Sequence, residues 1–131
     1  CNLQHTRLNV SGRVYSGGSS VVAPAQAVVA GMVDVVHSPQ GTAALISDNI
    51  TYQMAGKTGT SQVISIAQDA IYDEDSISER NRNHGLFIAF APVDKPRIVV
   101  AVIAENGGGS SAASPIARRV VDAWLIETED A

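Results

Sequence analysis

The sequence predicts an α+β fold, an antiparallel three-strand sheet with packed helices that include a C-terminal helix. Apolar residues recur at helical spacing over residues 24–36 and again from Pro115 onward. Three stretches rich in β-branched and small residues lie between these helices, at 52–65, 85–91 and 97–105. The order helix, strand, long loop, strand, strand, helix places helices on one or both faces of the sheet.

The first helix is predicted from the stretch PAQAVVAGMVDVV. Its apolar side is formed by Val28, Val29, Met32, Val33 and Val36. Pro24 suits the first helical turn, where a backbone N–H would have no partner. Residues 38–41, Ser-Pro-Gln-Gly, break the pattern and end the helix.

The strands differ in how they are connected. A polar stretch at 67–83 separates the first strand from the second and is predicted to be a long solvated loop with a helical turn. The stretch Pro-Val-Asp-Lys-Pro separates the second strand from the third and predicts an antiparallel hairpin. The last helix is expected to begin at Pro115, with an apolar stripe of Ile116, Val120, Val121, Trp124 and Leu125.

Length and charge exclude several function classes. The 131 residues carry a net charge of −4, and the nine Lys and Arg are scattered, whereas a nucleic-acid interface needs them clustered. Cys1 and His5 are too few ligands for zinc. The apolar run at 98–104 is far shorter than the roughly 20 residues of a membrane span. We expect the chain to be a piece of a longer protein, with a poorly ordered segment 1–20, one folded part 21–126 and an acidic tail 127–131.

The most informative motif is Lys57-Thr58-Gly59-Thr60 within the first strand. A K-T-G triplet, together with S-x-x-K and S-D-N, forms the motif set of class A β-lactamases and penicillin-binding proteins. Alone, the tetrapeptide is a weak signal, because strand lysines and threonines are common on solvated surfaces.

The flanking sequence makes the motif specific. QGTAALISDNITYQMAGKTGTSQV and RNHGLFIAFAPVDKPRIVVAVIAENGGGSSAASPIARRVVDAWL resemble the C-terminal part of the transpeptidase domain of class B penicillin-binding proteins of the elongation type. The resemblance covers roughly residues 21 to 126. The stretches FIAFAP and ENGGG match the transpeptidases better than β-lactamase-like hydrolases.

The resemblance implies a role for each residue of the motif. Lys57 is expected to be catalytic, supplying a positive charge that hydrogen-bonds toward the serine of a second motif and supports proton relay. Thr58 and Thr60 are expected to bind the carboxylate of the peptide or β-lactam through their hydroxyls. Gly59 is expected to let the substrate backbone approach, and the Thr60 backbone N–H is expected to stabilise the oxyanion.

The resemblance also implies a parent enzyme. Such enzymes are peptidoglycan D,D-transpeptidases that attack D-Ala-D-Ala stem peptides through a serine, are acylated by penicillins and need no cofactor or metal. The implied parent is anchored in the bacterial inner membrane, with its catalytic domain in the periplasm. It acts in lateral wall synthesis and cell shape with a glycosyltransferase and elongation-complex proteins.

The nucleophile motif of the family is absent. Met54 and Pro92 stand three residues before Lys57 and Lys95, so no S-x-x-K exists, and the chain alone is predicted to be inactive. A non-catalytic folded fragment or peptide-binding module therefore remains an alternative. Because the family pairs the strand at 97–105 with a strand from elsewhere in the domain, we also expect self-association through this edge.

Three other features compete for a catalytic role. The letters of Ser47-Asp48-Asn49 spell the second motif, but this stretch leads directly into the Lys57 strand, so a turn is predicted there instead. His84 could act as a general base, although a structural role at the strand entry is favoured. His37 is expected to cap the last turn of the first helix.

Overall fold

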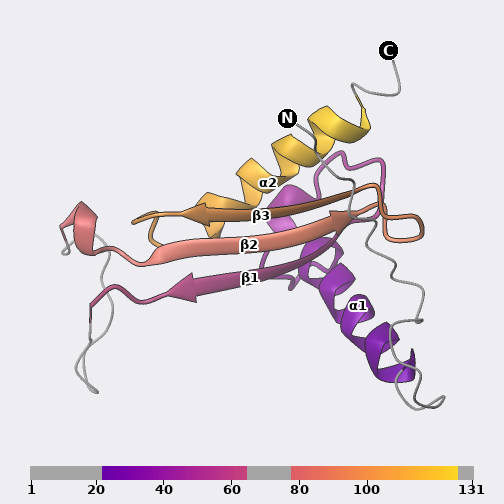
Figure 1. The fold of residues 1–131 in the computed structure, drawn as a ribbon, viewed down its shortest axis with the longest axis horizontal. Coiled ribbons are helices and arrows are strands. Elements are labelled where there is room, and N and C mark those ends of the chain that lie inside the picture. The colour runs from indigo at the N-terminus through magenta and orange to yellow at the C-terminus, as the bar shows by residue number, and fades with distance from the viewer. Residues whose placement is uncertain (1–21, 65–77, 127–131) are drawn as a thin grey trace, which may run out of the picture.

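The computed structural model describes residues 22–64 and 78–126. Its elements are α1 (Val22–His37), η1 (Ala44–Ile46), β1 (Ala55–Ser61), η3 (Glu79–Asn81), β2 (His84–Ala91), β3 (Ile98–Ala104) and α2 (Ser110–Leu125), shown in Figure 1. The predicted α+β class and element order are confirmed. Our expectations for residues 1–20, for most of the long loop and for the acidic tail lie outside the described residues.

The three strands form one antiparallel sheet in the order β1-β2-β3, so the predicted hairpin between β2 and β3 is confirmed. The register places Lys57 opposite Ile88 and Thr58 opposite Phe87. β1 is shorter than the predicted 52–65, and it starts later because the residues before it bond elsewhere. The Met54 N–H donates to the His37 ring, and the Gln53 carbonyl accepts from Val93 N.

Both helices pack on the same face of the sheet, which we call the covered face. It carries Gly85, Phe87, Ala89 and Ala91 of β2, all of them buried. Its apolar residues share one core with α1, through Val36, and with α2, through Ala113, Ala117, Val121 and Leu125. The strands cross in front of the two helices in Figure 1.

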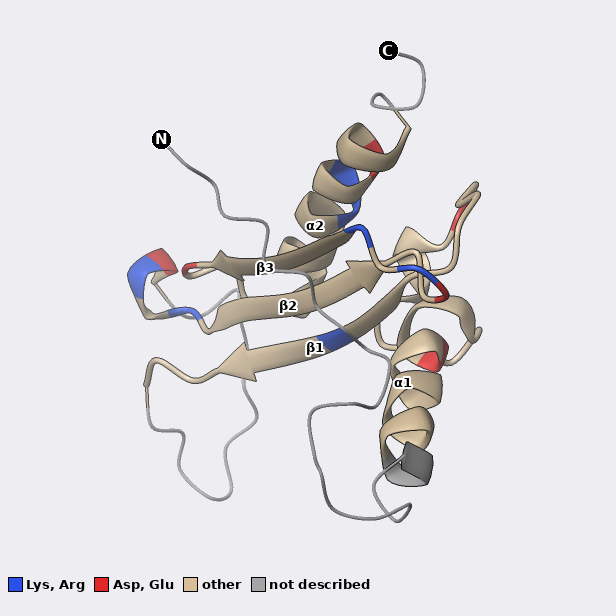
Figure 2. Cartoon of the chain, turned by 45° about the vertical axis from the view of Figure 1, so that its right-hand side comes forward, with Lys and Arg blue, Asp and Glu red and all other residues tan. Residues whose placement is uncertain are grey.

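The opposite face, which we call the open face, has no helix on it in the described part of the chain. Ile88, Val99 and Ile103 project from it and are 51%, 50% and 66% exposed. In the register, Ile88 lies opposite both Lys57 and Ala101, so Lys57 belongs to this face. Figure 2 shows that Lys57 is the one charged position within the three strands.

The start predicted for α2 was wrong. The helix begins at Ser110, and Pro115 lies inside it. Ala112 N donates to the Gly109 carbonyl at 3.1 Å, so the small residues 110–114 already close a helical turn. Pro115 is the sixth residue of the helix and lies beyond its first turn, so it cannot donate the intrahelical hydrogen bond that this position would otherwise make to the Ser111 carbonyl.

The stripe predicted for α2 was also partly wrong. Val121 and Leu125 are buried as expected, but their companions are Ala113 and Ala117. Ile116, Val120 and Trp124 are 48%, 44% and 46% exposed. Both rows have helical spacing. The alanine row faces the sheet because small side chains let the helix approach the strands closely.

Candidate active-site strand

The KTGT motif occupies the middle of β1, an edge strand. β2 pairs with one side of β1, and no described strand pairs with the other side. An edge strand presents unpaired N–H and C=O groups to which an extended peptide can add. The motif therefore combines chemical side chains with an available backbone edge.

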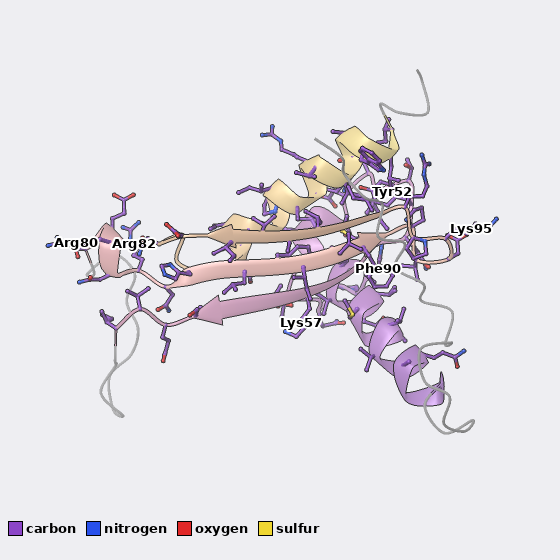
Figure 3. The ribbon with its side chains drawn as sticks, viewed as in Figure 1. Tyr52, Lys57, Arg80, Arg82, Phe90 and Lys95 are labelled. Carbon is purple, nitrogen blue, oxygen red and sulfur yellow. The ribbon has the colours of Figure 1, made fainter. Side chains whose placement is uncertain are left out.

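Lys57 is exposed at this edge, and Figure 3 shows it on the side of β1 away from β2. Its ammonium donates to the carbonyl of Thr58 at 2.5 Å. In a strand the N–H and C=O of one residue point to the same side, and residues two apart repeat that direction. Because Lys57 reaches the Thr58 carbonyl at the unpaired edge, that carbonyl points away from β2. The Thr60 N–H, two residues on, is then expected to point to the same unpaired edge.

The hydroxyls of Thr58 and Thr60 lie on the other side of β1 from Lys57. Thr58 Oγ1 is 2.8 Å from Oγ1 of Thr42, in the turn that follows α1. A Cβ built on Gly109 would be 3.9 Å from Thr60 Oγ1, so Thr60 lies beside the start of α2. The edge therefore offers an ammonium on one side and two hydroxyls on the other.

Gly59 differs from the glycines around it. A Cβ on Gly56 would meet the Phe87 ring at 2.5 Å, and one on Gly85 would meet the Gly109 carbonyl oxygen at 1.9 Å. Packing alone thus requires both of these glycines. A Cβ on Gly59 would make an ordinary 3.4 Å contact with Leu86 Cβ. The protein's own packing does not require glycine at this position of the motif.

The stretch Ser47-Asp48-Asn49 is a turn, as predicted. Ser47 Oγ donates to the Ala44 carbonyl at 2.7 Å, and Ile50 N donates to the Ser47 carbonyl. Asn49 has a φ of 54°, a left-handed conformation that asparagine tolerates. The Ser47 hydroxyl is engaged by its own turn.

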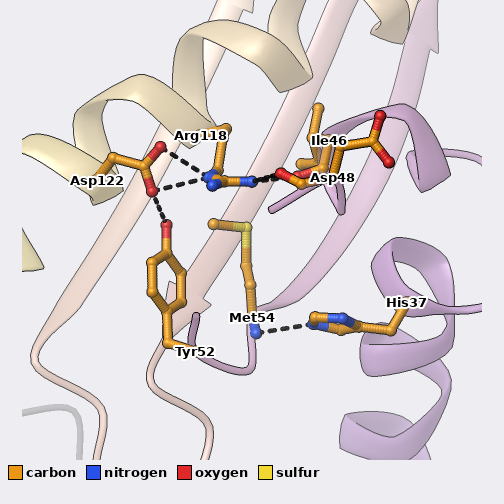
Figure 4. Close-up of polar contacts among 7 residues, drawn as sticks. All are labelled: His37, Ile46, Asp48, Tyr52, Met54, Arg118 and Asp122. Atoms are coloured by element: carbon orange, nitrogen blue, oxygen red, sulfur yellow. Dashed lines mark hydrogen bonds and ion pairs between the residues drawn. The ribbon is translucent and has the colours of Figure 1, made fainter. Parts of the chain in front are cut away.

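Both described histidines hold the backbone together. His84 Nδ1 accepts a hydrogen bond from Asn106 N at 2.9 Å, so the ring links β2 to the turn before α2. His37 lies in the last turn of α1, but its Nε2 accepts from Met54 N at 3.1 Å (Figure 4). The expected cap is therefore a tie between the end of α1 and the start of β1.

A polar cluster that sequence reasoning missed supports the segment leading into β1 (Figure 4). Tyr52 donates its hydroxyl to Asp122 at 2.5 Å, and Arg118 bonds both oxygens of that carboxylate. Arg118 also donates to the Ile46 carbonyl at 2.6 Å. Burial and the bond to Asp122 raise the pKa of Tyr52 above its ordinary value. Because Tyr52 and Asp122 are 70 residues apart, no local pattern could indicate this contact.

Within 22–64 and 78–126, no group of three or more His, Cys, Asp or Glu is placed to hold a metal ion. No helix in these ranges has the length and apolar character to cross a membrane.

Comparison with known proteins decides the family. The profile described as "Penicillin binding protein transpeptidase domain" matches residues 22–122. The chain belongs to this transpeptidase family. The resemblance seen in the sequence is thereby confirmed.

Relatives of known name are similar over most of the chain. The peptidoglycan D,D-transpeptidase MrdA of Acinetobacter baumannii is 52% identical over 95 residues, which is 72% of this chain and 14% of that protein. MrdA of Escherichia coli K12 is 39% identical over 96 residues, 73% of this chain and 15% of that protein. The chain thus spans about one seventh of the length of these transpeptidases.

Solved structures agree with the sequence relatives. Pseudomonas aeruginosa PBP2, solved in complex with WCK 5153, is 39% identical with a TM-score of 0.65, covering 80% of this chain and 20% of that one. Helicobacter pylori PBP2, solved in complex with MreC, is 25% identical with a TM-score of 0.64, covering 82% and 18%. The α+β sheet and its two helices therefore have the fold of this part of the transpeptidase domain.

Proposed function

We propose that the chain supplies the substrate-binding strand of a peptidoglycan D,D-transpeptidase. Lys57 and Thr60 take catalytic roles, while Thr58, Gly59 and Thr60 bind substrate. The observation that carries this proposal is the placement of KTGT on an unpaired edge strand, with its one ammonium and two hydroxyls at that edge. A stem peptide would add along this edge by backbone hydrogen bonds.

Each group has a task in acyl transfer. The hydroxyls of Thr58 and Thr60 donate to the terminal carboxylate of D-Ala-D-Ala or of a β-lactam. The Thr60 N–H donates to the carbonyl oxygen as it gains negative charge. Lys57 adds positive charge beside the reacting centre and hydrogen-bonds toward a serine of the S-x-N motif.

The glycine of the motif supports this assignment. Gly59 has room for a methyl group within the protein, unlike Gly56 and Gly85. A glycine that packing does not require is explained where another backbone must approach the strand. The bound peptide is that backbone in our proposal.

The rest of the parent enzyme supplies the nucleophile. A serine outside this chain attacks the carbonyl of the penultimate D-Ala, and the terminal D-Ala leaves with a proton. An amine of a second stem peptide then attacks the acyl-enzyme carbonyl and loses a proton, while the serine leaves and takes up a proton. The new amide bond is the cross-link. With no S-x-x-K, this chain alone forms no acyl-enzyme.

The setting of the parent enzyme is part of the proposal. We infer a protein anchored in the bacterial inner membrane, with this domain in the periplasm, acting with a glycosyltransferase and elongation proteins. Support comes from the MrdA relatives and from the Helicobacter pylori PBP2 solved with MreC. The isolated chain would self-associate through the unpaired edge of β3.

Intact-mass measurement with excess penicillin tests the proposal in two arms. The isolated chain should gain no mass, and the full-length protein should gain one drug per molecule. In the full-length protein, Lys57→Ala should slow acylation at least about 100-fold, the scale seen for acid–base groups, while Lys95→Ala should acylate normally. Equal acylation of the two variants, or an adduct on the isolated chain, would overturn the proposal.

A further inference from the structure

We propose that Thr42 is a positioning residue that aims the Thr58 hydroxyl at the substrate carboxylate. The inference rests on the proposed function of the KTGT strand and adds a residue outside that strand. The Oγ1 atoms of Thr42 and Thr58 are 2.8 Å apart, although the residues are separated by 16 positions. Thr42 is exposed, so its own burial does not account for this contact.

The turn that carries Thr42 is held firmly against the end of α1. Gly41 N donates to the Ser38 carbonyl at 2.8 Å, and Ala43 N donates to the Val35 carbonyl at 2.9 Å. A Cβ on Gly41 would lie 2.3 Å from that same Val35 oxygen, so the turn packs closely on the helix end. Ala43 is buried in the core, so both neighbours of Thr42 are anchored.

The strand that carries Thr58 is anchored on the same helix. A Cβ on Gly56 would lie 3.3 Å from a Val36 methyl group, and Met54 N donates to His37. Both threonines thus have backbones anchored on the last turn of α1. Their hydrogen bond joins two anchored segments, which gives the Thr58 oxygen a defined orientation.

The chemistry of hydroxyls then decides the direction of the bond. A threonine hydroxyl has one donor hydrogen and two lone pairs. When Thr58 donates its hydrogen to a carboxylate, its oxygen can only accept from Thr42. Thr42 therefore donates to Thr58, and Thr58 donates to the ligand. Hydrogen bonds in such a chain polarise and strengthen one another.

The test uses the full-length protein that carries this chain. Acylation rates are compared for one β-lactam with a free carboxylate and for its methyl ester. Thr42→Val, which keeps the shape and removes the hydroxyl, should slow acylation by the carboxylate form about 5- to 10-fold, the loss expected for one hydrogen bond. The ester rate should not change, and the loss should appear in binding rather than in the maximal rate. Thr42→Ser should restore the wild-type rate.

Controls separate this inference from the proposed function. Thr42→Ala serves if Thr42→Val does not fold, and thermal midpoints of both are compared with wild type. Equal loss for carboxylate and ester would mean that Thr42 only supports the fold, which overturns the inference. An unchanged Thr42→Val beside a weakened Thr58→Val also overturns it, while leaving the proposed function intact. If Thr58→Val and Thr60→Val do not distinguish carboxylate from ester, the proposed carboxylate site itself fails.

Discussion

The two faces of the sheet are built from similar apolar residues but are in different states. On β2, Phe87 points to the covered face and is fully buried, while its neighbour Ile88 points to the open face and is 51% exposed. Phe87 is buried because α1 and α2 pack on the covered face. Alternation in the sequence therefore identifies two apolar faces of a strand, but not which of the two faces is buried by the helices.

Exposed apolar side chains are not confined to the open face. Ile116, Val120 and Trp124 leave a second apolar row half-exposed on α2. The chain spans about one seventh of its MrdA relatives, so most of a parent protein would lie outside it. We infer that this remainder covers the open face. Lys57 lies at the margin of that face, where a catalytic half would meet the KTGT strand.

The largest expected effect comes from truncating the neighbours on β2. Phe87→Ala should lower the free energy of unfolding of the chain by about 3–5 kcal/mol, because it leaves a cavity between sheet and helices. Ile88→Ala should lower it by less than about 1 kcal/mol, since its side chain is already half in water. Urea denaturation of both variants measures the contrast, and equal losses would mean that the open face is covered in the isolated chain.

A matched pair of glycines gives the next largest effect. Gly85→Ala should destabilise the chain by about 1–3 kcal/mol, because the new methyl group meets the Gly109 carbonyl oxygen. Gly59→Ala should change stability by no more than about 0.5 kcal/mol. In the full-length protein the order should reverse for β-lactam acylation at a temperature where both are folded. Normal acylation by Gly59→Ala would remove the support that this glycine gives to the proposed site.

The third effect concerns the polar cluster under the covered face. Tyr52→Phe should lower the free energy of unfolding by about 1 kcal/mol near neutral pH, the usual value of one hydrogen bond. Because the pKa of Tyr52 is raised in the folded state, the stabilisation by its hydroxyl is fully present below about pH 10, the pKa of a tyrosine in the unfolded chain. It is lost as pH rises toward the folded pKa. Denaturation at several pH values should therefore show the gap between wild type and Tyr52→Phe closing in alkali.

The fold was largely predictable because its signals are local. Helical spacing indicated α1, β-branched runs indicated β2 and β3, and the Pro-Val-Asp-Lys-Pro stretch between them indicated their hairpin. The errors arose where two rows of side chains on one helix are both apolar. On α2, the rows led by Ala117 and Ile116 both have helical spacing, and only packing on the strands selects the alanines.

The candidate site was predictable only in part. KTGT is a contiguous motif, so its four residues could be named from the sequence. Thr42 belongs to a Gly-Thr-Ala turn visible in the sequence, yet its bond to Thr58 depends on how the end of α1 meets β1. The partnership of Tyr52 with Asp122 and Arg118 joins the segment before β1 to α2. Contacts of this kind need the tertiary structure.

The smallest effect on stability should accompany a change in association. Ile103→Lys places a charge among the exposed β3 side chains and should alter the free energy of unfolding by no more than about 0.5 kcal/mol. If copies of the chain pair through the edge of β3, burying this ammonium beside that edge should weaken their association at least about tenfold. Val28→Lys, on an exposed position of α1 that is 62% accessible, is the matched control. Sedimentation velocity over a concentration series should show wild type and Val28→Lys associating while Ile103→Lys stays monomeric. A wild-type chain that is monomeric throughout would show that the unpaired edge of β3 and its exposed apolar side chains are tolerated in water without self-association.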